Sequence, residues 1–303
     1  MTALNVQFPQ TILVATSFAD HPSLIPIATA QARRSGARLL LVHVVAANAA
    51  EKKAPAGTVN RADPVYCPRI PEKLASVARQ LQWQGISCEP VVLEGEPAEQ
   101  IAALAQTTGS GWVVVGAGSR GADGSVAEKL ISRLRIPVFV IGPRMPEYFA
   151  SDWASGRILL PVSLHHRRPS HIEFANQLAG ELRSHVALLH VLETSSMTFR
   201  QRQQTCEQAR IDLASIAARV ANPVSPMELL VREGNLVRAI VEEALCPHRD
   251  FIVMGTGSSL GDPHARTGVV HQVISGARCP VMAVHSSATD EAGAQEISTA
   301  SAA

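Results

Sequence analysis

Two stretches, Trp112-Val-Val-Val-Gly116 and Phe251-Ile-Val-Met-Gly255, decide the fold, because each is a short apolar run that ends in glycine and the second repeats the first. Four further segments recur in the same order. They are Thr11–Thr16 with Arg157–Val162, Leu39–Val44 with Val186–Val191, Val92–Gly95 with Val231–Gly234, and Ile136–Ile141 with Cys279–Val284. Five matches in one order indicate two copies of one domain.

Each copy alternates short apolar runs with stretches of helical periodicity. The runs are nearly continuous, as expected for strands with both faces buried. Ala98–Ala105 and Leu236–Leu245 repeat apolar residues at three- and four-residue spacing, which predicts helices. The alternation predicts an α/β fold with two tandem repeats. Each repeat should hold a five-stranded parallel sheet in the order 3-2-1-4-5, with helices on both faces.

The domain boundaries follow from the repeat. We expect a first domain at residues 1–144, a linker at 145–156, a second domain at 157–285 and a disordered, small and polar tail at 286–303. The offset between the copies is 147 at His43/His190, 139 at Gly116/Gly255 and 143 at Pro137/Pro280. The first copy therefore has extra residues before its third strand and fewer after Gly116, and both differences should lie in loops.

Composition disfavours several functional classes. A net charge of +1 and an aromatic content of 4% argue against a nucleic-acid-binding protein. Five cysteines without a C-x-x-C pair argue against a disulfide framework or a zinc ribbon. The longest apolar runs are strand-sized, so no membrane span is expected. These features predict a cytoplasmic protein that binds neither nucleic acid nor membrane.

The loop Gly116–Ser125 contains G-x-G-x-x-G, but it does not fit a dinucleotide site. It follows the fourth strand of its copy rather than the first, and no acidic residue ends the next strand. No Gly-Lys-Ser/Thr sequence of a Walker loop occurs. The sequence also lacks H-E-x-x-H, and no catalytic residues and no metal ligands are assigned.

Several motifs together resemble the universal stress protein family, which carries G-x-x-G, nine residues and then G-S/T after the fourth strand. The resemblance spans about residues 9–142 and 155–285 and rests on Gly124–Lys129, Glu94–Glu99, Val253–Thr256, Pro137-Val and Pro280-Val. It implies a tandem member of that family, in which backbone N–H groups and a helix N-terminus could hold the phosphates of ATP with magnesium. The implied binding residues are Ala15, Ser17, Val44, Gly116, Gly124 and Ser125 in the first copy, and Pro161, Ser163, Val191, Gly255, Gly268 and Val269 in the second.

Both copies depart from the family pattern. The family's nucleoside-contacting Asp is replaced by Ser17 and Ser163. The first copy keeps Gly124-Ser125, but its loop is about five residues short against the family pattern. The second copy keeps the spacing from Gly255 to Gly268, whereas Ser258 replaces the second glycine and Val269 the final hydroxyl.

These departures favour a non-enzymatic stress-response protein with degenerate nucleotide loops. The alternative is an adenine-nucleotide-binding module with weak or slow hydrolysis. An enzyme of the related nucleotide α-hydrolase type is disfavoured by the missing Asp and by the absence of lysine from the second copy.

The histidines offer a further hypothesis. His165, His166, His264, Arg266 and His271 come from loops expected at one edge of the second sheet. They could bind an anion or a metal, although a solvated basic loop explains them as well. His43 and His190 occupy matched positions and are expected to be structural.

The resemblance also implies that the last strands of the two repeats, Pro137–Ile141 and Pro280–Val284, pair within one chain. Association of two chains into a homodimer stays open.

Overall fold

Ten apolar runs form strands and eight segments form helices in the computed structural model, which describes residues 8–45, 69–118, 125–147, 157–164, 170–194, 197–220, 227–246, 250–256 and 263–285. At 170 and 263–267 only the backbone is described. Most of the expected linker, the expected tail, Gly124, His165 and His166 lie outside these ranges.

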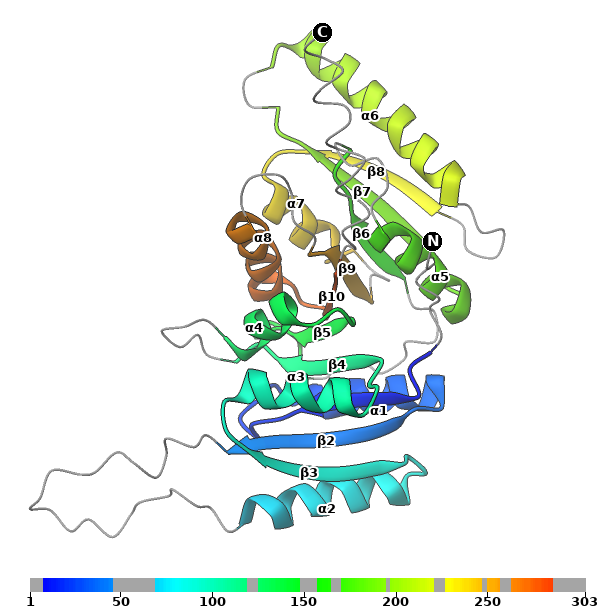
Figure 1. Cartoon of the computed structure of the whole chain (residues 1–303). Coiled ribbons are helices and arrows are strands. Elements are labelled where there is room, and N and C mark those ends of the chain that lie inside the picture. The colour runs from blue at the N-terminus through cyan, green and yellow to red at the C-terminus, as the bar shows by residue number, and fades with distance from the viewer. Residues whose placement is uncertain are drawn as a thin grey trace, which may run out of the picture.

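The two repeats have the same order of elements (Figure 1). The first comprises β1 (Thr11–Ala15), α1 (Leu24–Ser35), β2 (Arg38–Val45), α2 (Arg69–Trp83), β3 (Cys88–Glu94), α3 (Pro97–Thr107), β4 (Trp112–Gly116), α4 (Val126–Arg133) and β5 (Val138–Ile141). The second comprises β6 (Ile158–Pro161), α5 (Ser170–Leu182), β7 (Val186–Leu192), α6 (Phe199–Val220), β8 (Met227–Glu233), α7 (Leu236–Glu243), β9 (Phe251–Gly255), α8 (Pro263–Gly276) and β10 (Val281–Val284).

All ten strands belong to one sheet, in the order β3-β2-β1-β4-β5-β10-β9-β6-β7-β8. Each half has the predicted order 3-2-1-4-5, and its strands are parallel. The halves join where β5 and β10 pair antiparallel, with Phe139 opposite Met282. The predicted pairing of the last strands is therefore confirmed, and it gives two apolar edges a partner.

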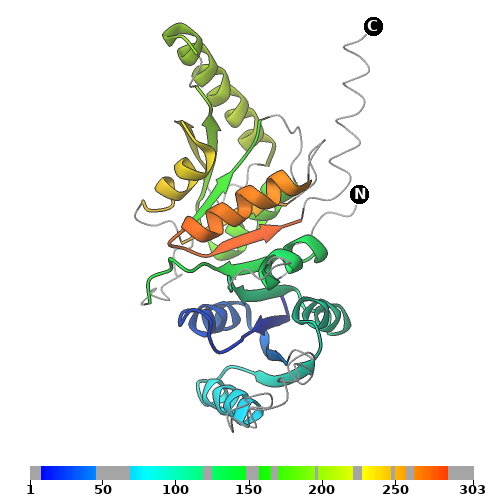
Figure 2. The same cartoon turned by 90° about the vertical axis from the view of Figure 1, so that its left-hand side faces the viewer.

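Helices cover both faces of the sheet (Figure 2). Alternate strand residues point to opposite faces, so Ile12 and Val14 enter one core and Leu13 and Ala15 enter the other. The first core also contains residues of α1, α2, α5 and α6, and the second contains residues of α3, α4, α7 and α8. Each core draws side chains from both repeats.

The turn after the third strand shows how matched residues build matched structure. Gly95 and Gly234 have φ of 135° and 121°, a backbone conformation that favours glycine. The next residue caps the following helix in each repeat. The Glu96 carboxylate accepts from the backbone N–H of Glu99, and the Asn235 side chain accepts from that of Arg238.

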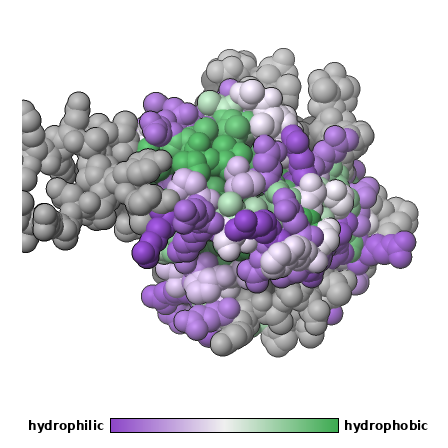
Figure 3. All heavy atoms as spheres, turned by 90° about the horizontal axis from the view of Figure 1, so that it is seen from below, coloured by the Kyte–Doolittle hydropathy of each residue, from purple (hydrophilic) through white to green (hydrophobic). Residues whose placement is uncertain are grey.

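The outer edges of the sheet are β3 and β8. Strand β3 exposes Glu89, Pro90 and Glu94, and both charge and proline oppose edge-to-edge association. Seen from this end, the described surface is mostly hydrophilic around one apolar area (Figure 3).

The repeats differ where the sequence offsets drift. Helix α2 has 15 residues and α6 has 22. Helix α8 begins at Pro263, so Gly268 and Val269 lie inside it. This corrects the expectation that Gly268-Val269 corresponds to the glycine-hydroxyl pair that opens the helix. Since α4 and α8 both end at an offset of 143, Gly268 matches Ser125 and His271 matches Glu128.

Candidate functional site

The switch point of the first repeat lies between the carboxyl ends of β1 and β4. These strands are neighbours, and their crossovers leave in opposite directions along the sheet. Such a point is where an open parallel sheet receives ligands. The structure brings Ala15, Ser17 and Gly116 together there.

The carboxylate of Asp20 occupies this point. It accepts hydrogen bonds from Thr16 Oγ1 at 2.8 Å, from the backbone N–H of Ser17 at 2.6 Å and from Ser17 Oγ at 3.0 Å. Hydrogen bonds to an ionised acceptor are stronger than neutral ones. The loop after β1 is therefore an anion-binding turn whose anion is supplied by the chain itself.

Asp20 also lies directly against Gly116. A Cβ at Gly116 would be only 2.8 Å from Asp20 Oδ1, so the close approach requires glycine at this position. Sequence reasoning assigned Gly116 to phosphate binding and missed Asp20. The sequence Thr16-Ser17 followed by Asp20 could have indicated this role. Hydroxyl and Asp side chains in one loop readily form hydrogen bonds with each other and with the local backbone.

The second repeat fills its switch point in a different way. Gly255 ends β9, and a Cβ there would lie 2.6 Å from Nδ1 of His171, in the first turn of α5. Gly255 thus makes room for a side chain of its own repeat. Ser163, which matches Ser17, is exposed, and Pro161 is half-buried.

His43 and His190 are structural, as expected from their matched positions. His43 Nδ1 lies 2.8 Å from the carbonyl oxygen of Thr16, and His190 Nδ1 lies 3.0 Å from that of Val162. A carbonyl oxygen only accepts, so Nδ1 is the donor in both repeats. Each bond ties the second strand of its repeat to the loop after the first strand.

An aromatic stack lies beside the first of these histidines. The ring of Phe18 stacks on His43 with centroids 5.6 Å apart, and Lys73 Nζ lies 4.3 Å from the Phe18 centroid. Phe18 has φ of 62°, which is uncommon for a non-glycine residue. The stack anchors the loop that carries Asp20.

Ser125, which the family resemblance assigns to phosphate binding, lies at the N-terminus of α4. Ser125 caps the helix, because its Oγ accepts from the backbone N–H of Glu128 at 3.2 Å. The carboxylate of Glu128 in turn accepts from the backbone N–H of Ser125 at 2.9 Å. This capping box places an acidic group where the helix N-terminus would otherwise favour an external anion.

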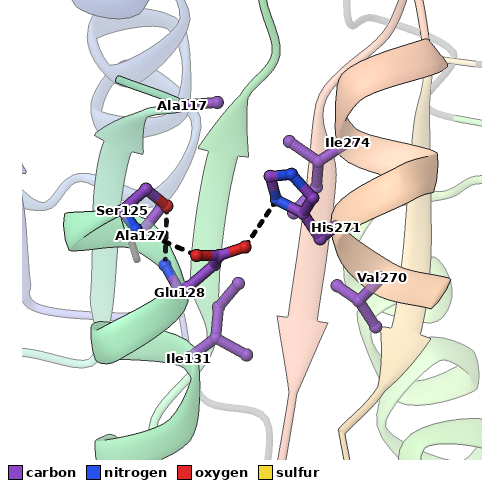
Figure 4. Close-up of a pocket in the computed structure, with 8 residues that line it drawn as sticks. All are labelled: Ala117, Ser125, Ala127, Glu128, Ile131, Val270, His271 and Ile274. Atoms are coloured by element: carbon purple, nitrogen blue, oxygen red, sulfur yellow. Dashed lines mark hydrogen bonds and ion pairs between the residues drawn. The ribbon is translucent and has the colours of Figure 1, made fainter. Parts of the chain in front are cut away.

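Glu128 also reaches the other repeat. Its Oε1 lies 2.8 Å from Nδ1 of His271 on α8, and the two side chains point toward each other across a shallow pocket (Figure 4). The apolar side chains around them are Ala117, Ala127, Ile131, Val270 and Ile274.

Lys129 follows Glu128 on α4, and its ammonium group forms an ion pair. Its Nζ lies 2.9 Å from Oε1 of Glu96 at the N-terminus of α3. Burial would raise the pKa of Glu96, but the hydrogen bonds from Lys129 and from the Glu99 N–H, with the charges of Lys129 and Arg133, together lower it. Glu96 therefore stays ionised and offsets the charge of Lys129.

A model of the universal stress protein family matches residues 9–142 and, separately, residues 155–285. The chain belongs to the universal stress protein family. It is a tandem member, with one family domain in each repeat.

Solved structures that match almost the whole chain show the same fold. A universal stress protein from Archaeoglobus fulgidus DSM 4304 is 17% identical, with a TM-score of 0.65, and the match covers 92% of this chain and 97% of that one. A functionally unknown protein from Pseudomonas aeruginosa PAO1 is 17% identical, with a TM-score of 0.60 and coverage of 97% and 98%. An Archaeoglobus fulgidus universal stress protein in complex with dAMP is 22% identical, with a TM-score of 0.31, and covers 43% of this chain and 96% of its own. No curated protein matches.

Other residues that the sequence of this universal stress protein singles out lie on several elements. Val44 and Val191 lie near the ends of β2 and β7 and pack against the second core. His271 contacts Glu128, and only the backbone of His264 is described. Within the described ranges, no group of three or more His, Cys, Asp or Glu could hold a metal ion. Among the helices described there, none is both long and apolar enough to cross a membrane.

Proposed function

We propose that this tandem universal stress protein is a non-enzymatic, cytoplasmic stress-response protein whose nucleotide loops do not hold a nucleotide tightly. One observation carries the proposal: Asp20 fills the switch point of the first repeat against Gly116. In the second repeat, the side chain of His171 lies against Gly255.

The electrostatics of the first site support this proposal. A nucleotide entering between β1 and β4 must displace the Asp20 carboxylate or place its phosphates near two carboxylates, those of Asp20 and Glu128. Each hydrogen bond to a charged group contributes about 1.5–3 kcal/mol. The contacts of a nucleotide would have to offset several kcal/mol before any net binding appeared.

The test moves the carboxylate from residue 20 to residue 17, where the family has its nucleoside-contacting Asp. Ser17→Asp alone would bring two carboxylates together, because Ser17 Oγ lies 3.0 Å from Asp20 Oδ1. The informative variant is therefore Ser17→Asp with Asp20→Ser, compared with wild type and Asp20→Ser by calorimetry with ATP and magnesium. We expect negligible binding by wild type and measurable binding by the double variant. Tight wild-type binding that Asp20→Ser abolishes would refute the proposal, since Asp20 would then contact the ligand.

The second candidate is an adenine-nucleotide-binding module with weak or slow hydrolysis, using ATP with magnesium. The first repeat favours it, because Gly116 ends β4 and Ser125 opens α4, a geometry that suits phosphate. Phosphate release from ATP by wild type separates the two functions. Release that Ser125→Ala reduces would support the module, and release equal to that of a buffer blank would support the non-enzymatic protein.

A further inference from the structure

The junction between the repeats is a local twofold. Phe139 of β5 lies opposite Met282 of β10, and the two are matched residues at the offset of 143. Val138 opposite Ala283 and Val140 opposite Val281 complete the symmetric ladder. Residues at matched positions near this axis therefore face each other. Two chains could form the same ladder by pairing like repeats, that is, two first repeats or two second repeats. We therefore asked which side chains favour the unlike pair, a first repeat with a second repeat.

The first distinguishing feature is the pair Glu128 and His271. They occupy matched positions on α4 and α8, they contact each other at 2.8 Å, and only 14% and 26% of their side-chain surfaces are exposed. Two first repeats paired in the same way would bring Glu128 against Glu128, and two ionised carboxylates repel each other. Two second repeats would bring His271 against His271. Only the unlike pair joins an acid to a base.

The second feature is steric and independent of charge. A Cβ at Gly142, just after β5, would lie 2.3 Å from the carbonyl oxygen of Ile274 on α8. The residue matched to Gly142 is His285, and the residue matched to Ile274 is Ile131. Two second repeats that kept the spacing seen between Gly142 and Ile274 would therefore bring the Cβ of His285 against the carbonyl oxygen of Ile274.

His285 has its own cross-repeat contact. Arg135 Nη1 of the first repeat lies 2.6 Å from His285 Nε2. Two first repeats would have Gly142 at that position and would lose this contact. Two second repeats would keep it, because Arg278 matches Arg135, so this contact disfavours only the pairing of two first repeats.

We infer that the β5–β10 interface is specific for unlike repeats, so that a chain closes on itself and copies do not join through their last strands. This inference is independent of the proposed function. It assigns any self-association of the protein to another surface.

The test uses the full chain and hydrogen exchange of the amides of β5 and β10. His271→Glu creates a carboxylate pair, and we expect exchange at Val138–Val140 and Val281–Ala283 to become at least about tenfold faster. Adding Glu128→Gln should restore slow exchange, because Gln keeps the capping box of α4 and removes one charge. Unchanged exchange in His271→Glu, or no rescue by Glu128→Gln, would overturn the inference.

A second pair of variants tests the steric feature. Gly142→His gives both repeats the residue of the second, and we expect exchange to accelerate more in β5 and β10 than at Leu39–Val42 of β2, which respond only to the loss of global stability. If that chain does not fold, Gly142→Ala adds only the Cβ and should show the same larger acceleration in β5 and β10. The matched control is His285→Ala, which removes a side chain without adding bulk near Ile274. Wild-type exchange in both Gly142 variants would overturn the steric argument.

Discussion

Asp20 and Gly116 are coupled across the first switch point, because the carboxylate lies where a Cβ of residue 116 would be. Gly116→Ala should therefore destabilise the protein by about 1–3 kcal/mol through overpacking. In an Asp20→Ser background the same change should cost less, since the atom that it meets is gone. Urea denaturation of the four proteins in this cycle measures the coupling. Additive effects of the two substitutions would show that Asp20 does not fill the site.

Cys279 makes stability sensitive to alkaline pH. Burial, with a smaller effect of the Asp250 charge, raises the pKa of this thiol from 9.0 to about 12. The unfolded chain therefore loses the thiol proton at lower pH than the folded chain, and stability falls as pH rises from about 9 to 12.

The size of this loss is on the order of 1 kcal/mol between pH 8 and pH 10 for one such thiol. Cys279→Ala should lack this component, so its stability should decline less over that interval. Denaturation at the two pH values checks the prediction, with the exposed Cys246→Ala as control. An equal decline in wild type and Cys279→Ala would contradict it.

At the scale of elements, the matched positions Ser125 and Gly268 should respond to alanine with opposite signs. Ser125 caps α4, so Ser125→Ala should cost about 0.5–2 kcal/mol. Gly268 lies inside α8 with open space around its Cβ position, so Gly268→Ala should stabilise by about 0.5–1 kcal/mol. Thermal denaturation of both variants provides the measurement. Destabilisation by Gly268→Ala would place the start of α8 near residue 268.

The strands and the repeat could be predicted, because matched apolar runs such as Trp112–Gly116 and Phe251–Gly255 carry that information locally, whereas the pairing of the last strands was implied by the family resemblance. The start of α8 could not be predicted, because Gly268-Val269 was aligned with Gly124-Ser125 one residue out of register. The roles of Asp20 and His171 could not be predicted either. Each depends on a contact with a glycine far away in sequence, Gly116 or Gly255, and periodicity does not report such contacts.

At the scale of the whole molecule, the shared sheet and shared cores predict cooperative unfolding. Each core contains side chains of both repeats, and β5 joins β10 without a break in the sheet. We expect a single calorimetric transition, with Gly142→Ala lowering the melting temperature of the entire chain. Two separate transitions in the wild type would show that the repeats unfold independently.

The junction of β5 with β10 also has a consequence for synthesis on the ribosome. Strand β5 ends at Ile141, whereas its partner begins at Val281, 140 residues later. At a translation rate of about 5–20 residues per second, β5 of the nascent chain therefore stays unpaired for roughly 7–28 s before β10 has been synthesised. During this interval the first repeat exposes an adhesive edge to neighbouring polypeptides, and slower translation of the second half should increase co-translational aggregation. Sedimentation of ribosome-bound chains stalled before and after Val284 would measure that exposure.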